Sequence, residues 1–388
     1  MVNRIFHFCT DVIFINGAFK QFDAAFEDRN FFYVYKEDNQ SLKNIHFRKN
    51  VHVFKGNIIR DIVSQIQNDD LVFFHALSPS FYEIVNLLPR KVKIIWFCFG
   101  YELYNDSRLF DEKILFDVIT FNKLKKDIKY SNFFYRKLLR PFYNVLYFIR
   151  YRQKTDLQNK LITLSRIDFL ACVFVEEYLS QQRILNQKKD FFKFCYYSID
   201  FMVNVLEKIN ENKFLIQIGN SATPTNNHLD VFDKLQRIKF ENSTLFIPLS
   251  YGEKWYVECI KNESLKLTNH KIEFVEELIP LEAYNKKLNQ VKIAIFNTRR
   301  QQAVGNILAL LFYGAKIFIS EQSPVYDFLK REGLIIYSYE RDLTTSEILE
   351  GLSLFQINHN REKLKQLFDE EKMIKDLKVF LHKIIEAK

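Results

Sequence analysis

The chain has 388 residues, of which 48% are hydrophobic and 27% charged, and its formal net charge is +9. This length exceeds what one ordinary core organises and predicts two domains, while the hydrophobic share excludes a disordered protein. The positive charge favours an anionic partner, namely nucleic acid, a phosphate-bearing small molecule or an acidic membrane surface.

The five cysteines are scattered and form no CxxC pair. They indicate reduced thiols in a cytosolic compartment, without a disulfide framework or a zinc site. The N-terminus lacks a secretory pattern, because His7 interrupts its short apolar run and Asp11 follows closely. Since no run of about 18 apolar residues occurs, we expect no membrane-spanning helix.

Short apolar strands alternate with helical segments over the first 100 residues. The predicted strands are Arg4–Cys9, Phe31–Tyr35, Val51–Phe54, Leu71–Phe74 and Val92–Phe99. Amphipathic helices are predicted between them, for example at Asn57–Gln67 and Phe81–Leu88. This alternation at the spacing of βαβ units predicts a parallel sheet.

The alternation stops at residues 105–156. Lys123–Lys154 carries ten basic residues against one acidic residue, with aromatic side chains among them, and Pro141 is predicted to divide the segment into two helices. This composition favours helices lying on an anionic membrane surface. Helices packed on the core with solvated lysines, or a nucleic-acid site, remain alternatives. The predicted membrane-facing residues are Arg136, Lys137, Arg140, Phe142, Tyr147, Phe148 and Arg150.

The alternation resumes with Leu161–Leu164 and Phe169–Val175, and the polar connector Asp200–Asn212 suggests a domain boundary. We therefore predict a first domain at residues 1–200, containing residues 105–156 as a helical insertion. A second domain is predicted at 201–372. A final helix at 373–388 is expected to pack back on the first domain.

The second domain repeats the same pattern. Its predicted strands are Phe214–Ile218, Leu245–Pro248, Ile272–Val275, Val291–Phe296, Ile317–Ser320 and Ile335–Tyr337. Ile307–Tyr313 reads as a buried helix, with Gly314 at the C-cap position.

Polar clusters occur where the strands of both halves end. Parallel sheets collect ligands at the carboxyl ends of their strands. The sequence therefore predicts an α/β protein of the GT-B type, with two Rossmann-like domains whose parallel sheets face a central cleft. This architecture is typical of enzymes that use sugar nucleotides.

Donor-binding candidates lie in the loops of the second domain. Small residues with free backbone N–H groups, hydroxyls and two arginines suit a diphosphate. Neither GxGxxG nor a Walker A motif is present, and ordinary capped turns or a solvated basic loop are the alternatives. The candidates are Gly219, Asn220, Ser221, Thr223, Asn227, Ser250, Tyr251, Arg299, Arg300, Gln301, Gln302, Gly305 and Asn306.

Three residues of the first domain are catalytic candidates. Glu102 follows an apolar strand and a glycine, where it could act as the general base that activates an acceptor hydroxyl, and Asp11 competes for this role. His75 could bind substrate or transfer a proton, although a lone histidine after a buried strand is often structural. We find neither a DxD motif nor metal-ligand spacing, which predicts chemistry without a metal or another cofactor.

Several ordered motifs resemble one known family. They are FFHALSP at Phe73–Pro79, WFCFGYELY at Trp96–Tyr104, IGNSATPTNNH at Ile218–His228, IPLSYG at Ile247–Gly252, LEAY at Leu281–Tyr284 and RQQAVGN at Arg300–Asn306. With them the chain resembles the lipid-linked N-acetylfucosaminyltransferases of bacterial surface polysaccharide assembly, also called 4-α-L-fucosyltransferases. Glu102, Ala76, Ala303 and Asn306 depart from the family pattern.

The resemblance implies a GT-B glycosyltransferase that is peripheral to the cytoplasmic face of the bacterial inner membrane. It also implies a dTDP-sugar donor and an acceptor glycan linked to undecaprenyl diphosphate. We expect no nucleic-acid partner. The basic and aromatic segment would then meet the polyprenyl acceptor at the bilayer. A glycosyltransferase using a UDP- or GDP-sugar on a soluble acceptor, and a non-catalytic membrane-bound scaffold, are the alternatives.

Overall fold

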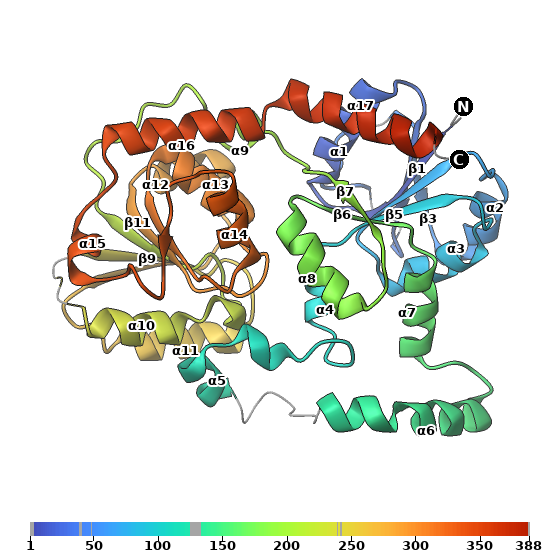
Figure 1. Ribbon diagram of the computed structural model, residues 1–388, viewed down its shortest axis with the longest axis horizontal. Coiled ribbons are helices and arrows are strands. Elements are labelled where there is room, and N and C mark those ends of the chain that lie inside the picture. The colour runs from blue at the N-terminus through green and yellow to red at the C-terminus, as the bar shows by residue number, and fades with distance from the viewer. Residues whose placement is uncertain are drawn as a thin grey trace. The chain divides into compact units, whose positions relative to one another are not determined.

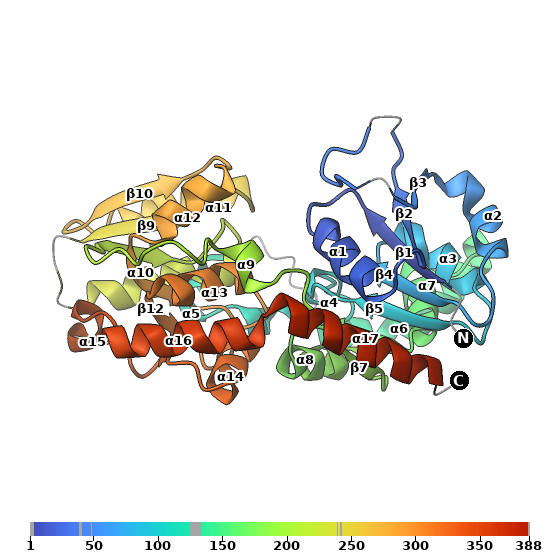
Figure 2. The ribbon, with the colours of Figure 1, turned by 90° about the horizontal axis from the view of Figure 1, so that it is seen from above.

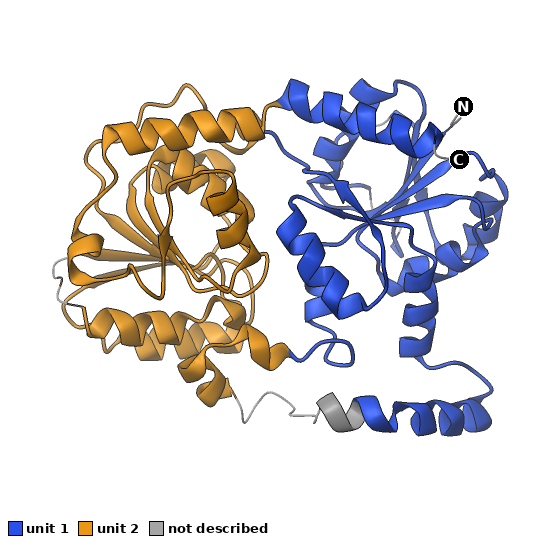
Figure 3. Ribbon diagram, in the orientation of Figure 1, with its two compact units in different colours: residues 1–111, 131–198, 370–388 blue, residues 112–130, 199–369 orange. Residues whose placement is uncertain are grey.

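The computed structural model describes residues 4–38, 41–47, 49–124, 133–238, 240 and 243–386, with side chains of residues 133–136 excluded. The chain forms two compact units (Figure 3). Unit 1 comprises Met1–Asp111, Ser131–Ser198 and Glu370–Lys388, and unit 2 comprises Glu112–Tyr130 and Ile199–Asp369.

Unit 1 contains a parallel sheet of seven strands in the order β3-β2-β1-β4-β5-β6-β7 (Figure 1). The strands are β1 (Ile5–Thr10), β2 (Asn30–Tyr35), β3 (Val51–Phe54), β4 (Leu71–His75), β5 (Lys93–Phe97), β6 (Phe169–Cys172) and β7 (Asp190–Lys193). The chain winds outward in both directions from β1 and β4, which is the doubly wound order of dinucleotide-binding folds.

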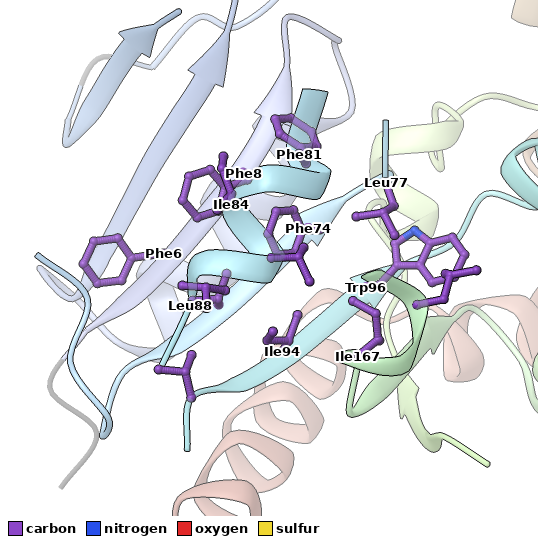
Figure 4. Packing of buried hydrophobic residues seen from close by; sticks show 14 of the residues in the cluster. Phe6, Phe8, Phe74, Leu77, Phe81, Ile84, Leu88, Ile94, Trp96 and Ile167 are labelled. Carbon is purple, nitrogen blue, oxygen red and sulfur yellow. The ribbon is translucent and has the colours of Figure 1, made fainter. Parts of the chain in front are cut away.

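The helices of unit 1 connect these strands. They are α1 (Ile15–Ala25), α2 (Ile59–Ser64), α3 (Tyr82–Leu87), α4 (Tyr101–Tyr104), α6 (Phe133–Tyr151), α7 (Asp156–Ser165), α8 (Val175–Leu185) and α17 (Glu370–Glu386), with 3-10 turns η1 (Gly56–Ile58) and η2 (Pro79–Phe81). Apolar side chains such as Phe8, Phe74, Phe81 and Trp96 fill the space between sheet and helices (Figure 4). Burial of this apolar area is the main favourable term for the fold.

Unit 2 repeats the topology with six parallel strands in the order β10-β9-β8-β11-β12-β13. The strands are β8 (Leu215–Ile218), β9 (Thr244–Pro248), β10 (Lys271–Val275), β11 (Val291–Phe296), β12 (Lys316–Ile319) and β13 (Tyr337–Ser338). The predicted bounds of β11 are confirmed, and Gly314 caps the following helix with a positive φ of 86°.

The helices of unit 2 include one segment from earlier in the chain. They are α5 (Val118–Leu124), α9 (Ile199–Met202), α10 (His228–Gln236), α11 (Lys254–Ser264), α12 (Leu281–Leu288), α13 (Val304–Tyr313), α14 (Pro324–Arg331), α15 (Thr345–Leu349) and α16 (Leu354–Leu367), with 3-10 turns η3 (Glu112–Leu115) and η4 (Pro224–Asn226). The sequence-based prediction places residues 105–156 in the first domain, whereas residues 112–124 belong to unit 2. Their side chains Phe116 and Leu124 lie in the core of that unit.

The last helix, α17, packs on α1 of unit 1 (Figures 1 and 2). Phe380 lies against Phe192 of β7, with ring centroids 4.4 Å apart, and Lys20 of α1 donates to Glu370. Helix α17 thus lies on unit 1, the unit on which the prediction places the last helix. It begins at Glu370 rather than at residue 373.

Two local predictions are wrong. Leu161–Leu164 belongs to helix α7 rather than to a strand, because Thr155 and Gln158 form a capping box that starts a helix there. Pro141 lies inside the single 19-residue helix α6 and does not divide it. A proline removes one backbone hydrogen bond, and the exposed position of this helix allows water to replace it.

Candidate active site

The topology of unit 2 places two polar loops side by side. β8 and β11 are neighbours from which the chain winds in opposite directions, and ligands of such sheets bind at the carboxyl ends of strands at this point. The loop after β8 begins at Gly219 and the loop after β11 begins at Asn297. Most of the predicted donor-binding residues belong to these two loops.

The loop after β8 is held in a fixed shape by its own side chains. Gly219 has a positive φ of 61°, and a Cβ atom there would lie 2.6 Å from Nε2 of His228. The amide of Asn226 donates to the carbonyl of Ser221 at 3.0 Å, and Ser221 donates to Thr223 at 3.0 Å. Only glycine therefore fits at the start of the loop.

Side chains from three loops meet in unit 2. The side-chain amide of Asn220 donates to the hydroxyl of Tyr251, which follows β9. Gln302 donates from Nε2 to Oδ1 of Asn220 at 3.4 Å and accepts from the hydroxyl of Thr225 at 2.7 Å. Ser250 precedes Tyr251 and is half-buried. The structure thus brings Asn220, Tyr251 and Gln302 into one cluster.

Helix α13 presents an uncapped N-terminus beside this cluster. Ala303 has a positive φ of 60° and no side chain caps the first turn, so its N–H groups are available to an anion. A Cβ atom on Gly305 would meet no atom within 4 Å, which leaves space for a ligand. Asn306 accepts a hydrogen bond from the hydroxyl of Tyr284 at 2.5 Å.

Buried polar atoms precede this helix without a hydrogen-bond partner. They include the hydroxyl oxygen of Thr298 and the side-chain oxygen of Gln301. Since a buried polar group without a partner is costly, these atoms point to a polar ligand at the loop. Arg300 lies between them in the sequence and is half-buried.

The side chains of Arg299 and Asn227 have partners within unit 2, and these are not a nucleotide-sugar donor. Arg299 forms an ion pair with Asp117 at 3.0 Å and donates to the carbonyl of Phe116 at 2.8 Å. The amide of Asn227 donates to the carbonyls of Leu115 and Asn297, and its oxygen accepts from the backbone of Asp117. Both side chains hold residues 115–117 on unit 2, so their placement does not support our prediction that they bind the donor.

Sequence reasoning missed the role of Asp230. Its carboxylate accepts from the backbone N–H groups of Ile119 and Thr120, at 2.7 and 2.9 Å, and thereby caps helix α5. Residues 112–124 are thus held at the donor loop by Asp230, Asn227 and Arg299. The one local signal was Asp117, an N-cap type residue that accepts from the backbone N–H of Val118.

Glu102 is the catalytic candidate of unit 1 whose environment suits a general base. It lies in α4 and is 8% exposed. Its Oε1 atom accepts from the backbone N–H of Leu77 at 3.4 Å and from the indole of Trp96 at 3.3 Å. Figure 4 shows Leu77 and Trp96 next to each other. Burial raises the pKa of Glu102 to about 7, although these hydrogen bonds act in the opposite direction.

His75 is part of a buried chain of hydrogen bonds. The side-chain amide of Asn30 donates to two backbone carbonyls, so its oxygen must accept from Nε2 of His7. Nδ1 of His7 then accepts from Nε2 of His75, and Nδ1 of His75 accepts from the hydroxyl of Tyr196 at 2.7 Å. Burial lowers the pKa of both histidines, so the rings are neutral.

This chain occupies both ring nitrogens of His75, which is 1% exposed. Its placement therefore supports a structural role rather than the predicted catalytic one. The carboxylate of Asp11 is also engaged in structural hydrogen bonds. It accepts from the backbone N–H groups of Lys43, Asn44 and Ile45. Burial would raise its pKa, but these hydrogen bonds and Lys36 lower it overall. Asp11 thus holds a loop and is a weak base.

Helix α6 has an apolar outer face. Leu138, Phe142, Val145 and Ile149 recur at helical spacing and are exposed, Phe142 by 72%. Lys137 and Arg150 are exposed, and Phe148 is too. The face also includes Leu139 and Leu146, and of its six apolar residues the prediction named only Phe142.

Two predicted membrane-facing residues lie on the opposite, inner face of α6. Arg140 donates to the carbonyl of Arg108 in unit 1, and Tyr147 is half-buried beside Tyr143 and Tyr151. The side chain of Arg136 lies outside the described residues.

Within the part of the chain that the structure describes, no group of three or more histidine, cysteine, aspartate or glutamate side chains could hold a metal ion. Among the described helices, none combines the length and the hydropathy that crossing a membrane requires.

Comparison with known sequences identifies the family. The sequence model of 4-alpha-L-fucosyltransferases, glycosyl transferase group 56, matches residues 143–367, which is more than half of the chain. The chain belongs to this fucosyltransferase family. The predicted family is thereby confirmed, and this fucosyltransferase family member is a glycosyltransferase enzyme.

Solved structures share the fold of this chain. Sucrose-phosphate synthase from Thermosynechococcus elongatus has a TM-score of 0.61 at 8% identity, over 99% of this chain and 100% of that one. HepE from Anabaena, solved with UDP and glucose, has a TM-score of 0.58 at 10% identity, over 98% and 100%. At such identities the likeness concerns the fold alone. It confirms the GT-B class for this fucosyltransferase family member.

Proposed function

We propose that this enzyme transfers a deoxy or deoxyamino sugar, such as fucose or N-acetylfucosamine, from a nucleotide-diphosphate donor to a glycan linked to undecaprenyl diphosphate. A dTDP-sugar is the favoured donor, and the reaction serves surface polysaccharide synthesis. The enzyme would act at the cytoplasmic face of the bacterial inner membrane as a peripheral protein. The match to the fucosyltransferase family is the observation that supports this class of transferred sugar.

The donor proposal rests on the loops of unit 2. The diphosphate would lie on the uncapped N-terminus of α13, next to Gly305, with Arg300 supplying positive charge. The cluster of Asn220, Tyr251 and Gln302 would contact the sugar or the diphosphate. Developing charge on the leaving group would be stabilised by these fixed donors.

The base proposal rests on the environment of Glu102. A general base works best when its pKa lies near the working pH, and burial raises the pKa of Glu102 to about 7. The carboxylate would accept the proton of the acceptor hydroxyl as that oxygen attacks the anomeric carbon and the nucleoside diphosphate leaves.

The membrane proposal rests on α6. Its exposed apolar face would enter the acyl boundary, while the exposed cations Lys137 and Arg150 would meet anionic headgroups. This places the enzyme where a polyprenyl-linked acceptor is available.

A thermal-shift series with dTDP, UDP and GDP tests the donor. We expect dTDP to raise the melting temperature most, because a ligand that binds the folded state stabilises it. Arg300→Ala should weaken dTDP binding by about tenfold or more, through loss of a charge-assisted contact, whereas Arg237→Ala, an exposed arginine of unit 2, should not. A larger shift with UDP or GDP would favour the alternative donor, and no shift with any nucleotide would favour a non-catalytic scaffold.

Unchanged dTDP affinity in Arg300→Ala would show that the loop after β11 is not the diphosphate site. The variant Arg299→Ala distinguishes the role of Arg299 from that of Arg300. Because Arg299 pairs with Asp117, its loss should increase proteolysis near residues 112–124 more than it weakens dTDP binding.

A further inference from the structure

A polar pocket of unit 1 lies outside the loops described so far. It has a volume of about 530 Å³ and is lined by Pro79, Tyr82, Glu83, Asn86, Arg108, Asp156 and Asn159. These residues come from the turn after β4, helix α3, the loop after α4 and the first turns of α7. All of them belong to one compact unit.

The charges around this pocket do not favour an anion. Arg108 is bound by both oxygens of Asp106 at 2.8 Å, and Lys160 also donates to Asp106 at 2.8 Å. The pocket itself contributes two further carboxylates, those of Glu83 and Asp156. Positive charge is thus balanced, so a phosphate would find no surplus of cationic groups.

The lining suits an uncharged, hydroxyl-rich ligand. Two carboxylates accept hydrogen bonds, two carboxamides both donate and accept, and a tyrosine ring offers an apolar face. Burial and the nearby carboxylate of Asp106 raise the pKa of Tyr82 to about 12, so its hydroxyl remains a donor at neutral pH. Such a mixture of directional polar groups around one aromatic ring is chemistry that recognises a sugar ring.

The inner face of α6 is attached to two walls of the pocket. Arg140 donates to the carbonyl of Arg108, and Asn144 accepts from the hydroxyl of Thr155, the residue before Asp156. The apolar side chains of α6 lie on its opposite face. A ligand in the pocket would therefore sit beside a helix suited to a membrane surface.

We propose that this pocket binds an uncharged sugar unit of the lipid-linked acceptor. This inference rests on the proposed function, because it assigns part of that acceptor to named residues. The sugar would be held by Glu83, Asn159 and Asp156 while the lipid remains in the bilayer contacted by α6. Phosphate groups of the same acceptor would lie outside the pocket.

Binding is tested on the full chain without turnover. Saturation-transfer NMR with maltose, lactose and N,N′-diacetylchitobiose should show binding to the wild type. The double variant Glu83→Gln, Asn159→Ala should weaken it by at least about tenfold, the loss expected when hydrogen bonds to a charged group and an amide are removed. Asp69→Asn, an exposed carboxylate of unit 1 outside the pocket, is the control. Inorganic phosphate should not compete.

No sugar binding to the wild type, equal binding by the double variant, or competition by phosphate would each overturn the proposal. Transfer assays on the same samples separate it from the proposed function. If the enzyme transfers sugar and the double variant keeps the acceptor KM, the pocket proposal fails while the function holds. If the pocket binds sugars but no nucleotide-sugar is a donor, the pocket holds while the function fails.

Discussion

Two buried ionisable groups of unit 1 illustrate how similar sequence positions acquire different chemistry. Glu102 and His75 both follow buried strands, and both were catalytic candidates. Glu102 keeps a pKa of about 7 and can gain or lose a proton at neutral pH. His75 has both nitrogens in hydrogen bonds and a pKa lowered by burial. The difference depends on partners distant in sequence, such as Asn30 and Tyr196.

Glu102→Gln should abolish a proton-accepting function while leaving nucleotide binding intact. We expect kcat to fall by about 10²–10⁴-fold, the usual contribution of a general base. In the wild type, kcat should decline below about pH 7, where Glu102 is protonated. Steady-state kinetics across pH 5–9 measure both effects. Near-normal turnover in the variant would contradict the assignment.

The same group makes stability depend on pH. The folded-state pKa of Glu102 is raised from 4.5 to about 7, so protonation of this carboxyl group favours the folded state. The resulting contribution to the free energy of unfolding is fully present below pH 4.5 and is lost as the pH rises to 7. The loss is roughly 3 kcal/mol in the free energy of unfolding. Urea titrations at pH 5 and pH 8 should show a smaller difference for Glu102→Gln than for the wild type.

Tyr196→Phe tests the buried hydrogen-bond chain. Removing the hydroxyl leaves Nδ1 of His75 without a donor, and we expect unfolding free energy to fall by about 1–3 kcal/mol. Turnover well below the melting temperature should stay the same. A large loss of kcat at unchanged stability would instead support a catalytic role for His75. Chemical denaturation and kinetics on one sample distinguish these results.

At the scale of elements, α6 differs from the other helices of unit 1 in turning an apolar face outward. Changing Leu138, Phe142 and Ile149 together to Gln should remove much of its affinity for anionic vesicles, since each buried apolar side chain contributes about 1.5–3 kcal/mol. Liposome flotation with phosphatidylglycerol vesicles measures this. The triple change of Leu265, Leu278 and Phe355, exposed residues of unit 2, is the control.

Undiminished flotation of the α6 variant would mean that another surface carries the binding. Flotation should also decline with salt, because Lys137 and Arg150 are exposed and screening weakens their attraction to anionic lipids. Binding that is insensitive to salt would contradict the part assigned to these cations.

Elements with strong apolar patterns were predictable, because burial on both faces requires continuous apolar strands. Val291–Phe296 is the clearest case. Leu161–Leu164 was misread since a short apolar run fits a helix or a strand, and the capping box at Thr155 decided between them. The donor loop showed the same limit: Arg299 has the right chemistry for a phosphate, but its partner Asp117 is 182 residues earlier in the sequence.

At the scale of the whole molecule, each unit is assembled from separated parts of the chain. Leu381 in α17 is fully buried in unit 1 although all of Ile199–Asp369 precedes it in unit 2. Leu381→Ala should cost about 2–5 kcal/mol, and hydrogen exchange should accelerate in β1 and β7 but not in β11. Val379→Ala, at an exposed position of the same helix, is the control. Equal acceleration in both units would show that they unfold together.

The return of α17 to unit 1 has a consequence for synthesis on the ribosome. Domains generally fold as units during translation, the N-terminal one first. Here α17, which covers α1 of unit 1, is translated only after unit 2 is complete at Asp369. Unit 1 therefore cannot be completed while unit 2 is translated, and the surface of α1 that α17 covers stays exposed during this time. Chaperone binding to the emerging chain should concentrate on that interval.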